Sequence, residues 1–129
     1  MWRVARIAGL LLLCFCFFTT CKRSEREMNP TVHTVEITGN RSPLRFDPDP
    51  VEAYPGDRIE WAHAEADSFV VHIEAEIAEP ADPRAGQGAR AVTVIRGQAR
   101  PDRYKYSVTI YIGDEPIEQD PEIIVKPRG

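Results

Sequence analysis

The stretch from Phe46 to Trp61 constrains the fold of this chain more than any other part of the sequence. At its centre, Pro55-Gly56-Asp57 predicts a tight turn, because proline presets φ and glycine accepts a positive φ at no steric cost. Apolar residues alternate with polar ones on both sides of this turn, and a period of two is typical of strands with one buried face. The alternating apolar residues are Val51, Ala53, Ile59 and Trp61.

The same alternation continues along the chain and predicts an all-β domain. Two long strands are expected, at residues 68–78 and 103–112, followed by loops at 79–90 and 113–121. The other clear strands are predicted at residues 31–38, 58–64, 91–95 and 122–126. Seven or eight strands in about a hundred residues, with no helical periodicity after the N-terminal segment, predict a β-sandwich of two sheets.

The N-terminal segment has the layout of a secretory signal. Residues 1–6 carry two arginines and no acid, and residues 7–18 are almost wholly apolar. This apolar run is shorter than the roughly 20 residues that a membrane-spanning helix needs. We therefore predict a signal peptide at residues 1–20, a polar tether at residues 21–30, and one β domain at residues 31–129.

The end of this segment, Thr19-Thr20-Cys21, resembles the signal of bacterial lipoproteins, although Phe18 and Thr20 depart from the usual leucine and small residue. The resemblance implies that Cys21 is lipidated and becomes the N-terminus. It also implies sorting to the outer membrane, facing the periplasm, because Lys22 rather than aspartate follows the cysteine. The alternative is a plain cleaved signal, giving a secreted protein, or a short uncleaved anchor, with Cys21 incidental.

Charge and cysteine content argue against a nucleic-acid-binding protein and against a disulfide-stabilised domain. Of the 16 basic residues, Arg3 and Arg6 lie within the signal, which leaves 14 bases against 20 acids, a net charge of −6. An acidic domain without a basic cluster does not fit nucleic acid, which requires a positive surface. Cys14 and Cys16 are lost with the signal, so the remaining domain has one thiol and no internal disulfide.

Residues 31–126 resemble the cupredoxin family, the fold of plastocyanin and other blue-copper proteins. An aromatic-x-aromatic pair at Tyr104 and Tyr106 and a closing strand at 120–125 match the end of that fold. The central matches are Phe46, Pro48, Val51, Ala53, Gly56, Asp57, Ile59 and Trp61. The resemblance implies a Greek-key β-sandwich.

The copper ligands of that family are absent from the matching positions. A blue-copper site uses two histidines, one cysteine and usually a weak axial methionine. The cysteine position is occupied by Val108, and the two histidine positions by Phe69 and Tyr111. No methionine follows Met28. We therefore predict no metal and no cofactor. Phe69, Tyr111 and Tyr54 are expected to lie together at that end of the domain, as a plug or as a contact surface.

Three histidines remain as candidate metal ligands. His72 lies in strand phase with Glu74 and Glu76, which predicts a solvent-facing side chain. His63 shares a face with Trp61 and is interpreted as a hydrogen-bonded structural residue, whereas His33 belongs to an expected edge strand. Scattered histidines without close spacing are weak evidence for a metal site. The alternative left open is a metal-binding or electron-transfer protein with an atypical site of these histidines.

No catalytic constellation stands out. Ser68 and Ser107 have no recognisable triad spacing, and Gly86-Gln87-Gly88 lacks the lysine and helix of a phosphate-binding loop. The sequence therefore predicts a protein that is not an enzyme. The leading hypothesis is a lipid-anchored cell-envelope protein whose copper-free, cupredoxin-like domain serves in binding or scaffolding, with the membrane as its one predicted partner.

Overall fold

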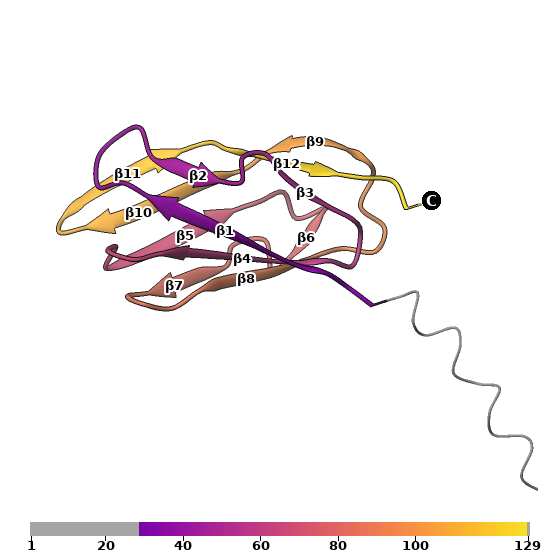
Figure 1. Cartoon of the computed structure of the whole chain (residues 1–129), viewed down its shortest axis with the longest axis horizontal. Coiled ribbons are helices and arrows are strands. Elements are labelled where there is room, and N and C mark those ends of the chain that lie inside the picture. The colour runs from indigo at the N-terminus through magenta and orange to yellow at the C-terminus, as the bar shows by residue number, and fades with distance from the viewer. Residues whose placement is uncertain (1–28, 129) are drawn as a thin grey trace, which may run out of the picture.

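The structure, a computed structural model, describes residues 29–128 (Figure 1). These residues form twelve strands and no helix, so within this part of the chain nothing could cross a membrane as a helix. The predicted signal peptide, most of the tether and Cys21 lie outside the described residues. The first six strands are β1 (Val32–Thr38), β2 (Arg45–Asp47), β3 (Val51–Ala53), β4 (Arg58–His63), β5 (Ser68–His72) and β6 (Ala78–Glu79). The others are β7 (Arg84–Gly86), β8 (Ala91–Ile95), β9 (Asp102–Lys105), β10 (Ser107–Ile112), β11 (Glu115–Gln119) and β12 (Glu122–Val125).

The strands are arranged in three sheets, with the orders β2-β1-β4-β8-β6, β11-β10-β5-β7 and β3-β12-β9. Two pairs, β1 with β4 and β3 with β12, are parallel, and the other pairs are antiparallel. The second and third sheets meet where the Tyr106 N–H donates to the Pro121 carbonyl at 3.0 Å. This arrangement confirms an all-β fold that resembles a sandwich, although its second layer is divided into two sheets.

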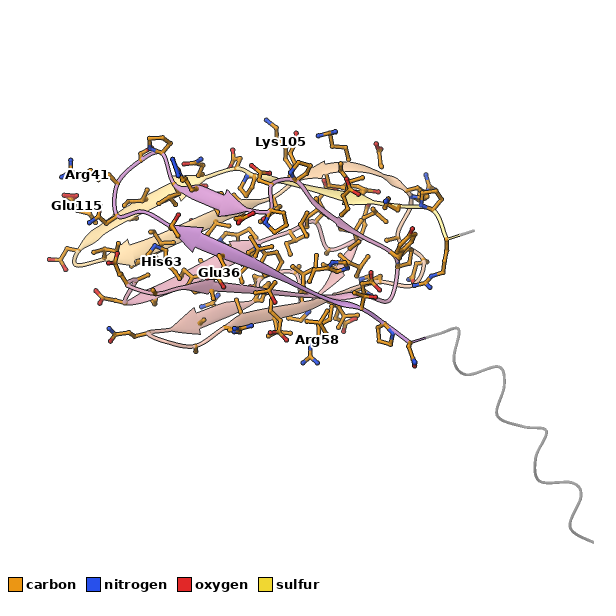
Figure 2. All side chains as sticks on the ribbon, in the orientation of Figure 1. Glu36, Arg41, Arg58, His63, Lys105 and Glu115 are labelled. Atoms are coloured by element: carbon orange, nitrogen blue, oxygen red, sulfur yellow. The ribbon has the colours of Figure 1, made fainter. Side chains whose placement is uncertain are left out.

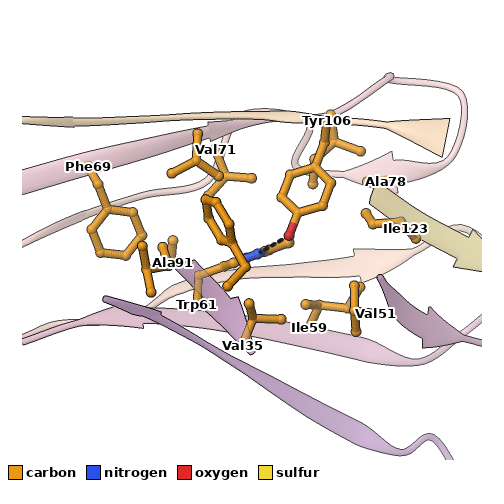
Figure 3. Packing of buried hydrophobic residues seen from close by; sticks show 14 of the residues in the cluster. Val35, Val51, Ile59, Trp61, Phe69, Val71, Ala78, Ala91, Tyr106 and Ile123 are labelled. Carbon is orange, nitrogen blue, oxygen red and sulfur yellow. Dashed lines mark hydrogen bonds between the residues drawn. The ribbon is translucent and has the colours of Figure 1, made fainter. Parts of the chain in front are cut away.

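The core lies between these layers and is centred on Trp61, which is fully buried (Figure 3). The Trp61 indole N–H donates a hydrogen bond to the Tyr106 hydroxyl at 3.0 Å, and the two ring centroids are 5.5 Å apart. Burial raises the pKa of Tyr106 far more than the bond from Trp61 lowers it, so the hydroxyl stays protonated. An aromatic pair with a satisfied polar group fixes the distance between strand β4 and the opposite layer.

The prediction of one long strand at residues 68–78 is wrong. Strand β5 ends at His72, and residues 73–77 form a turn in which the Ile77 N–H donates to the Glu74 carbonyl at 3.0 Å. Ile73 and Ile77 are both buried, whereas Ala75 is exposed. A turn that carries the chain from the β5 sheet to the β6 sheet therefore buries the same apolar residues as a continuous strand would. The apolar alternation alone does not distinguish such a turn from a strand.

Three further expectations need correction. The long strand at residues 103–112 is divided at Tyr106, because β9 pairs with β12 and β10 pairs with β5 and β11. The expected loop at residues 79–90 contains β7, which pairs with β5. The expected loop at residues 113–121 contains β11, which returns beside β10 as a hairpin. The closing strand and the strand at residues 91–95 are confirmed.

Candidate functional site

His63 is a structural residue, as its position beside Trp61 in the sequence indicated. Its side chain is buried at the end of β4. Charged side chains such as Arg41, in contrast, lie on the outside of the molecule (Figure 2). The ring Nε2 lies 2.8 Å from the Gly39 carbonyl, and Nδ1 accepts hydrogen bonds from the Glu65 and Ala66 N–H groups at 3.0 and 3.1 Å. Nδ1 must therefore be unprotonated, and Nε2–H is the donor. Neither nitrogen has a lone pair left for a metal ion.

Replacing His63 with alanine is expected to lower the free energy of unfolding by about 2 kcal/mol, because it strands two N–H groups and a carbonyl. The matched control is His72→Ala, which removes an exposed imidazole and should change stability by less than about 0.5 kcal/mol. Urea unfolding of both variants measures the difference. Equal stabilities of the two variants would contradict the structural role of His63.

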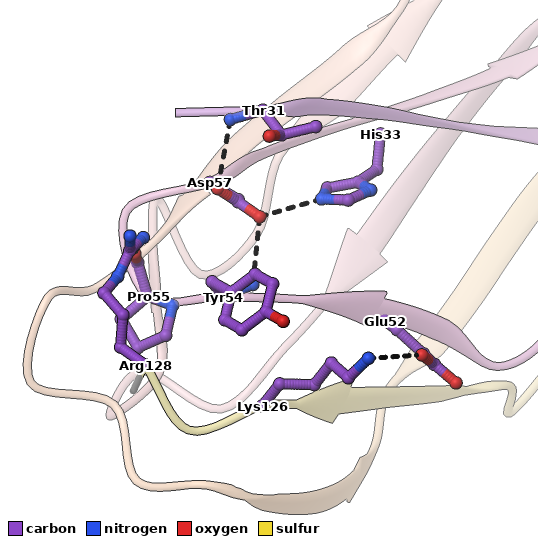
Figure 4. A network of polar contacts seen from close by, with 8 residues as sticks. All are labelled: Thr31, His33, Glu52, Tyr54, Pro55, Asp57, Lys126 and Arg128. Atoms are coloured by element: carbon purple, nitrogen blue, oxygen red, sulfur yellow. Dashed lines mark hydrogen bonds and ion pairs between the residues drawn. The ribbon is translucent and has the colours of Figure 1, made fainter. Parts of the chain in front are cut away.

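His33 is part of a different network, centred on Asp57 (Figure 4). Asp57 is 2% exposed in the turn between β3 and β4, and its carboxylate accepts three hydrogen bonds. The donors are the Thr31 N–H at 3.0 Å, the Tyr54 N–H at 2.9 Å and His33 Nε2 at 2.9 Å. Burial raises the pKa of the Asp57 carboxyl, but these hydrogen bonds, with that of His33 the strongest, outweigh it and hold the pKa below its usual value.

The three histidines do not converge on one site. Across the parallel pair β1 and β4, His33 lies opposite Ile59 and His63 opposite Ile37, so the two histidines are four residues apart along the sheet, about 13 Å. His72 is exposed on β5, in the other layer. No group of three potential metal ligands occurs within residues 29–128. Strand β1, expected at an edge, is flanked by β4 throughout and by β2 at residues 36–38.

The positions matching the copper ligands are close together on β5 and β10 but are divided between the two faces of that sheet. Phe69 and Val108 are buried in the core, whereas Tyr111 lies opposite Ser68 on the outward face of the same sheet. Tyr54 follows β3 at the end of the domain that holds the C-terminus, far from the end of β10 (Figure 1). There it lies under the cations of Lys126 and Arg128. Phe69 and Tyr111 border one surface hollow, so the expected cluster of Phe69, Tyr111 and Tyr54 is wrong only in including Tyr54.

A different surface emerges on the outward face of β5, β7 and β10. Because Phe69 and Val71 face the core, Ser68, Val70 and His72 face outward. The strand register places Tyr111 and Gly86 on either side of Ser68, and Arg84 beside Val70. These residues surround an open hollow of about 530 Å³, which we call the outer hollow. It is lined by Ser68, Val70, His72, Arg84, Gly86 and Tyr111, with the buried Phe69 and Ala85 beneath.

The outer hollow is held by ordered backbone contacts on two sides. The Tyr111 carbonyl accepts from the Asp67 N–H at 2.9 Å, and the Asp67 carboxylate accepts from the Gly113 N–H at 2.9 Å. On the other side, the Val71 N–H donates to the Pro83 carbonyl at 2.9 Å just before Arg84. Sequence reasoning missed this site, because it treated residues 79–90 as a loop and so did not place Arg84 beside β5.

Ser107 and His72 are the pair on this face closest to a possible nucleophile and base. Ser107 lies opposite His72 in the register of β10 and β5, so the two residues share the outward side. Within residues 29–128, the histidine rings that form hydrogen bonds are those of His33 and His63, so neither Ser107 nor a carboxylate is bonded to the His72 ring. A serine nucleophile needs both a base in contact and a group that orients the base.

Two comparisons with known proteins, against family models and against curated proteins, assign no family or function to the chain. No protein-family model matches the chain. No curated protein matches it either.

Proposed function

We propose that this chain is a non-catalytic, cell-envelope binding protein, anchored through a lipid on Cys21 and carrying a copper-free domain at residues 31–129. The observation that carries the proposal is the use of the histidines. Both ring nitrogens of His63 form hydrogen bonds with backbone groups, and the His33 ring is bonded to Asp57. Hydrocarbon side chains, those of Phe69 and Val108, occupy two positions where copper ligands would be needed.

The domain is proposed to be a Greek-key sandwich of the cupredoxin type. Four features support this. The Gly56-Asp57 turn connects two strands and carries a positive φ of 95° at Gly56. Trp61, at the position of the family's aromatic residue, is at the centre of the core. Tyr106 of the aromatic-x-aromatic pair packs against it, and the closing strand β12 pairs beside β9.

The anchor limits how far the domain can lie from the membrane. The ten residues of the tether, 21–30, can span at most about 35 Å, so a lipid on Cys21 keeps the domain close to the bilayer. The chain enters β1 and leaves β12 at the same end of the domain (Figure 1). The outer hollow, on the face of β5, β7 and β10, lies on the side of the domain rather than at the tethered end, and it stays open to a partner in the envelope.

Purification of the full chain from membranes tests this function. We expect a mass increment of a lipid on Cys21, its loss together with membrane attachment in Cys21→Ser, and only substoichiometric metal after exposure to copper and zinc. Elemental analysis and intact mass spectrometry make both measurements. Stoichiometric copper or zinc would contradict this function and favour metal binding. An unmodified Cys21 in the soluble fraction would contradict the lipid anchor.

A further inference from the structure

The charge of the outer hollow is opposite to that of the domain around it. The whole chain carries 20 acids against 16 bases. The lining of the outer hollow nevertheless includes the guanidinium of Arg84 and the imidazole of His72 and, among the described residues, no carboxylate. Arg84 approaches Asp82 at 3.7 Å, but these side chains are 71% and 59% exposed. An exposed pair at that distance contributes little, so Arg84 is available to an anionic ligand.

The shape of the outer hollow suits a flat ring. Tyr111, Ser68 and Gly86 are neighbours across three adjacent strands. The Tyr111 side chain is 39% exposed at one end of this row, although most large apolar and aromatic residues of the domain are buried. At the other end, a Cβ added to Gly86 would meet no atom within 4 Å. The row therefore forms a shallow shelf with an aromatic side chain at one end and open space at the other.

We propose that the outer hollow binds a carbohydrate that carries a carboxylate. This inference rests on the proposed binding function and names its ligand class. The apolar C–H face of a sugar ring packs on the Tyr111 side chain, as large and rigid aromatic side chains do at other recognition surfaces. The carboxylate of the sugar accepts a bidentate hydrogen bond from Arg84. The hydroxyl groups exchange hydrogen bonds with Ser68 and with the ring of His72.

The size and character of the outer hollow favour this ligand over others. Its volume of about 530 Å³ lies within the range of small-ligand sites, roughly 300–1,000 Å³, and accommodates one or two sugar rings. The mixture of hydroxyl, imidazole, guanidinium and phenol groups suits a ligand with many hydroxyls better than a hydrocarbon. The strand pairing and the Asp67 contacts hold the backbone that carries these groups, which lowers the entropic cost of recognition.

Titration of the full-length chain with tetrasaccharides tests the proposal. The acidic probes are tetramers of glucuronate and of galacturonate, and the neutral probes are the corresponding tetramers of glucose and galactose. Isothermal titration calorimetry is expected to show saturable binding of at least one acidic tetramer, about tenfold tighter than that of its neutral counterpart, a difference of about 1.4 kcal/mol. Raising the salt concentration should narrow this difference, because the Arg84 contact is exposed and screened.

Two variants and two matched controls locate the binding. Tyr111→Ala should abolish binding, and Arg84→Gln should weaken only the acidic tetramer by about tenfold. The control for Tyr111 is Tyr54→Ala, since Tyr54 is 40% exposed at a distant end of the domain, and the control for Arg84 is Arg45→Gln on β2. Both controls should bind as the unmodified chain does. Circular dichroism verifies that each variant is folded.

Three results would overturn the proposal: no binding of either acidic tetramer at millimolar concentration, equal affinity for acidic and neutral tetramers, or unchanged binding in folded Tyr111→Ala. None of them affects the anchored, metal-free function, which is decided by the mass of Cys21 and the metal content. Conversely, stoichiometric metal would reject the proposed function even if the sugar titration succeeded, so the two failures are distinguishable.

Discussion

Replacing Trp61 with alanine is expected to lower the free energy of unfolding by about 3–5 kcal/mol. The total for a domain of this size is on the order of 5–15 kcal/mol, so the variant should be largely unfolded at modest urea concentrations. The indole is fully buried between the layers, so its removal leaves a large cavity. It also strands the Tyr106 hydroxyl, which accepts the Trp61 N–H at 3.0 Å. Urea unfolding monitored by circular dichroism measures this loss as a lower midpoint. The m-value should stay unchanged, because a changed m-value would indicate a change other than stability.

Two milder changes separate packing from hydrogen bonding in this pair. Tyr106→Phe keeps both rings and removes only the acceptor, which should cost about 1–2 kcal/mol, because a buried N–H then lacks a partner. Trp61→Phe keeps an aromatic ring but leaves a smaller cavity and an unpaired tyrosine hydroxyl, and it should be intermediate between the other two variants. A loss below about 1.5 kcal/mol in Trp61→Ala would show that the indole does not hold the two layers together.

Features specified by neighbouring residues could be predicted from the sequence. The turn at Gly56-Asp57, the strands that flank it and the burial of Trp61 depend on a glycine and on alternation within a few residues, and they are found where expected. The outward direction of His72 and the inward direction of His63 follow from the same strand phase. Strand phase is a local property, so it survives even where the strand boundaries are wrong.

Features specified by long-range pairing could not be predicted. Ile73 and Ile77 remain buried on either side of a turn, so the alternation is the same for a continuous strand and for a change of sheet. The division at Tyr106 has the same origin, because β9 and β10 differ only in the strands they pair with. Strand β11 could not be recognised because residues 113–121 contain four acids and two prolines, a composition typical of loops.

In the candidate site, too, local features could be predicted and features set by long-range pairing could not. The sequence indicated that Phe69 and Val108 cannot bind copper, because this depends on their chemical identity alone. It could not indicate that Tyr111 faces away from Phe69, a relation set by the register of β10 against β5. The outer hollow depends on two strand pairings and on a three-residue strand, β7, with no apolar alternation long enough to detect.

The second large effect is expected at Asp57. Asp57→Ala should lower the free energy of unfolding by about 3 kcal/mol, since it removes an acceptor of three hydrogen bonds and leaves the N–H groups of Thr31 and Tyr54 without partners. Asp57→Asn keeps the shape and one acceptor oxygen, so about half of that loss is expected. His33→Gln, which retains an N–H donor, should cost less than about 1 kcal/mol.

The contribution of Asp57 also depends on pH, and the sign follows from its depressed pKa. Hydrogen bonds to the carboxylate hold the folded-state pKa below that of the unfolded chain, about 3.9. The unfolded state therefore binds more protons in this range, and stability rises with pH across it. The extra stability is fully present above about pH 5 and is lost as pH falls through the folded-state pKa.

Urea unfolding of the unmodified chain and of Asp57→Asn between pH 7 and pH 3 measures this dependence directly. The difference in the free energy of unfolding between the two proteins should shrink as the pH falls from about 5 to 3, where the Asp57 carboxyl takes up its proton. Subtracting the variant removes the contribution of the other carboxylates, which both proteins share. A difference that stays constant between about pH 5 and pH 3, or one that grows over this range, would mean that the hydrogen bonds of Asp57 do not favour its charged form.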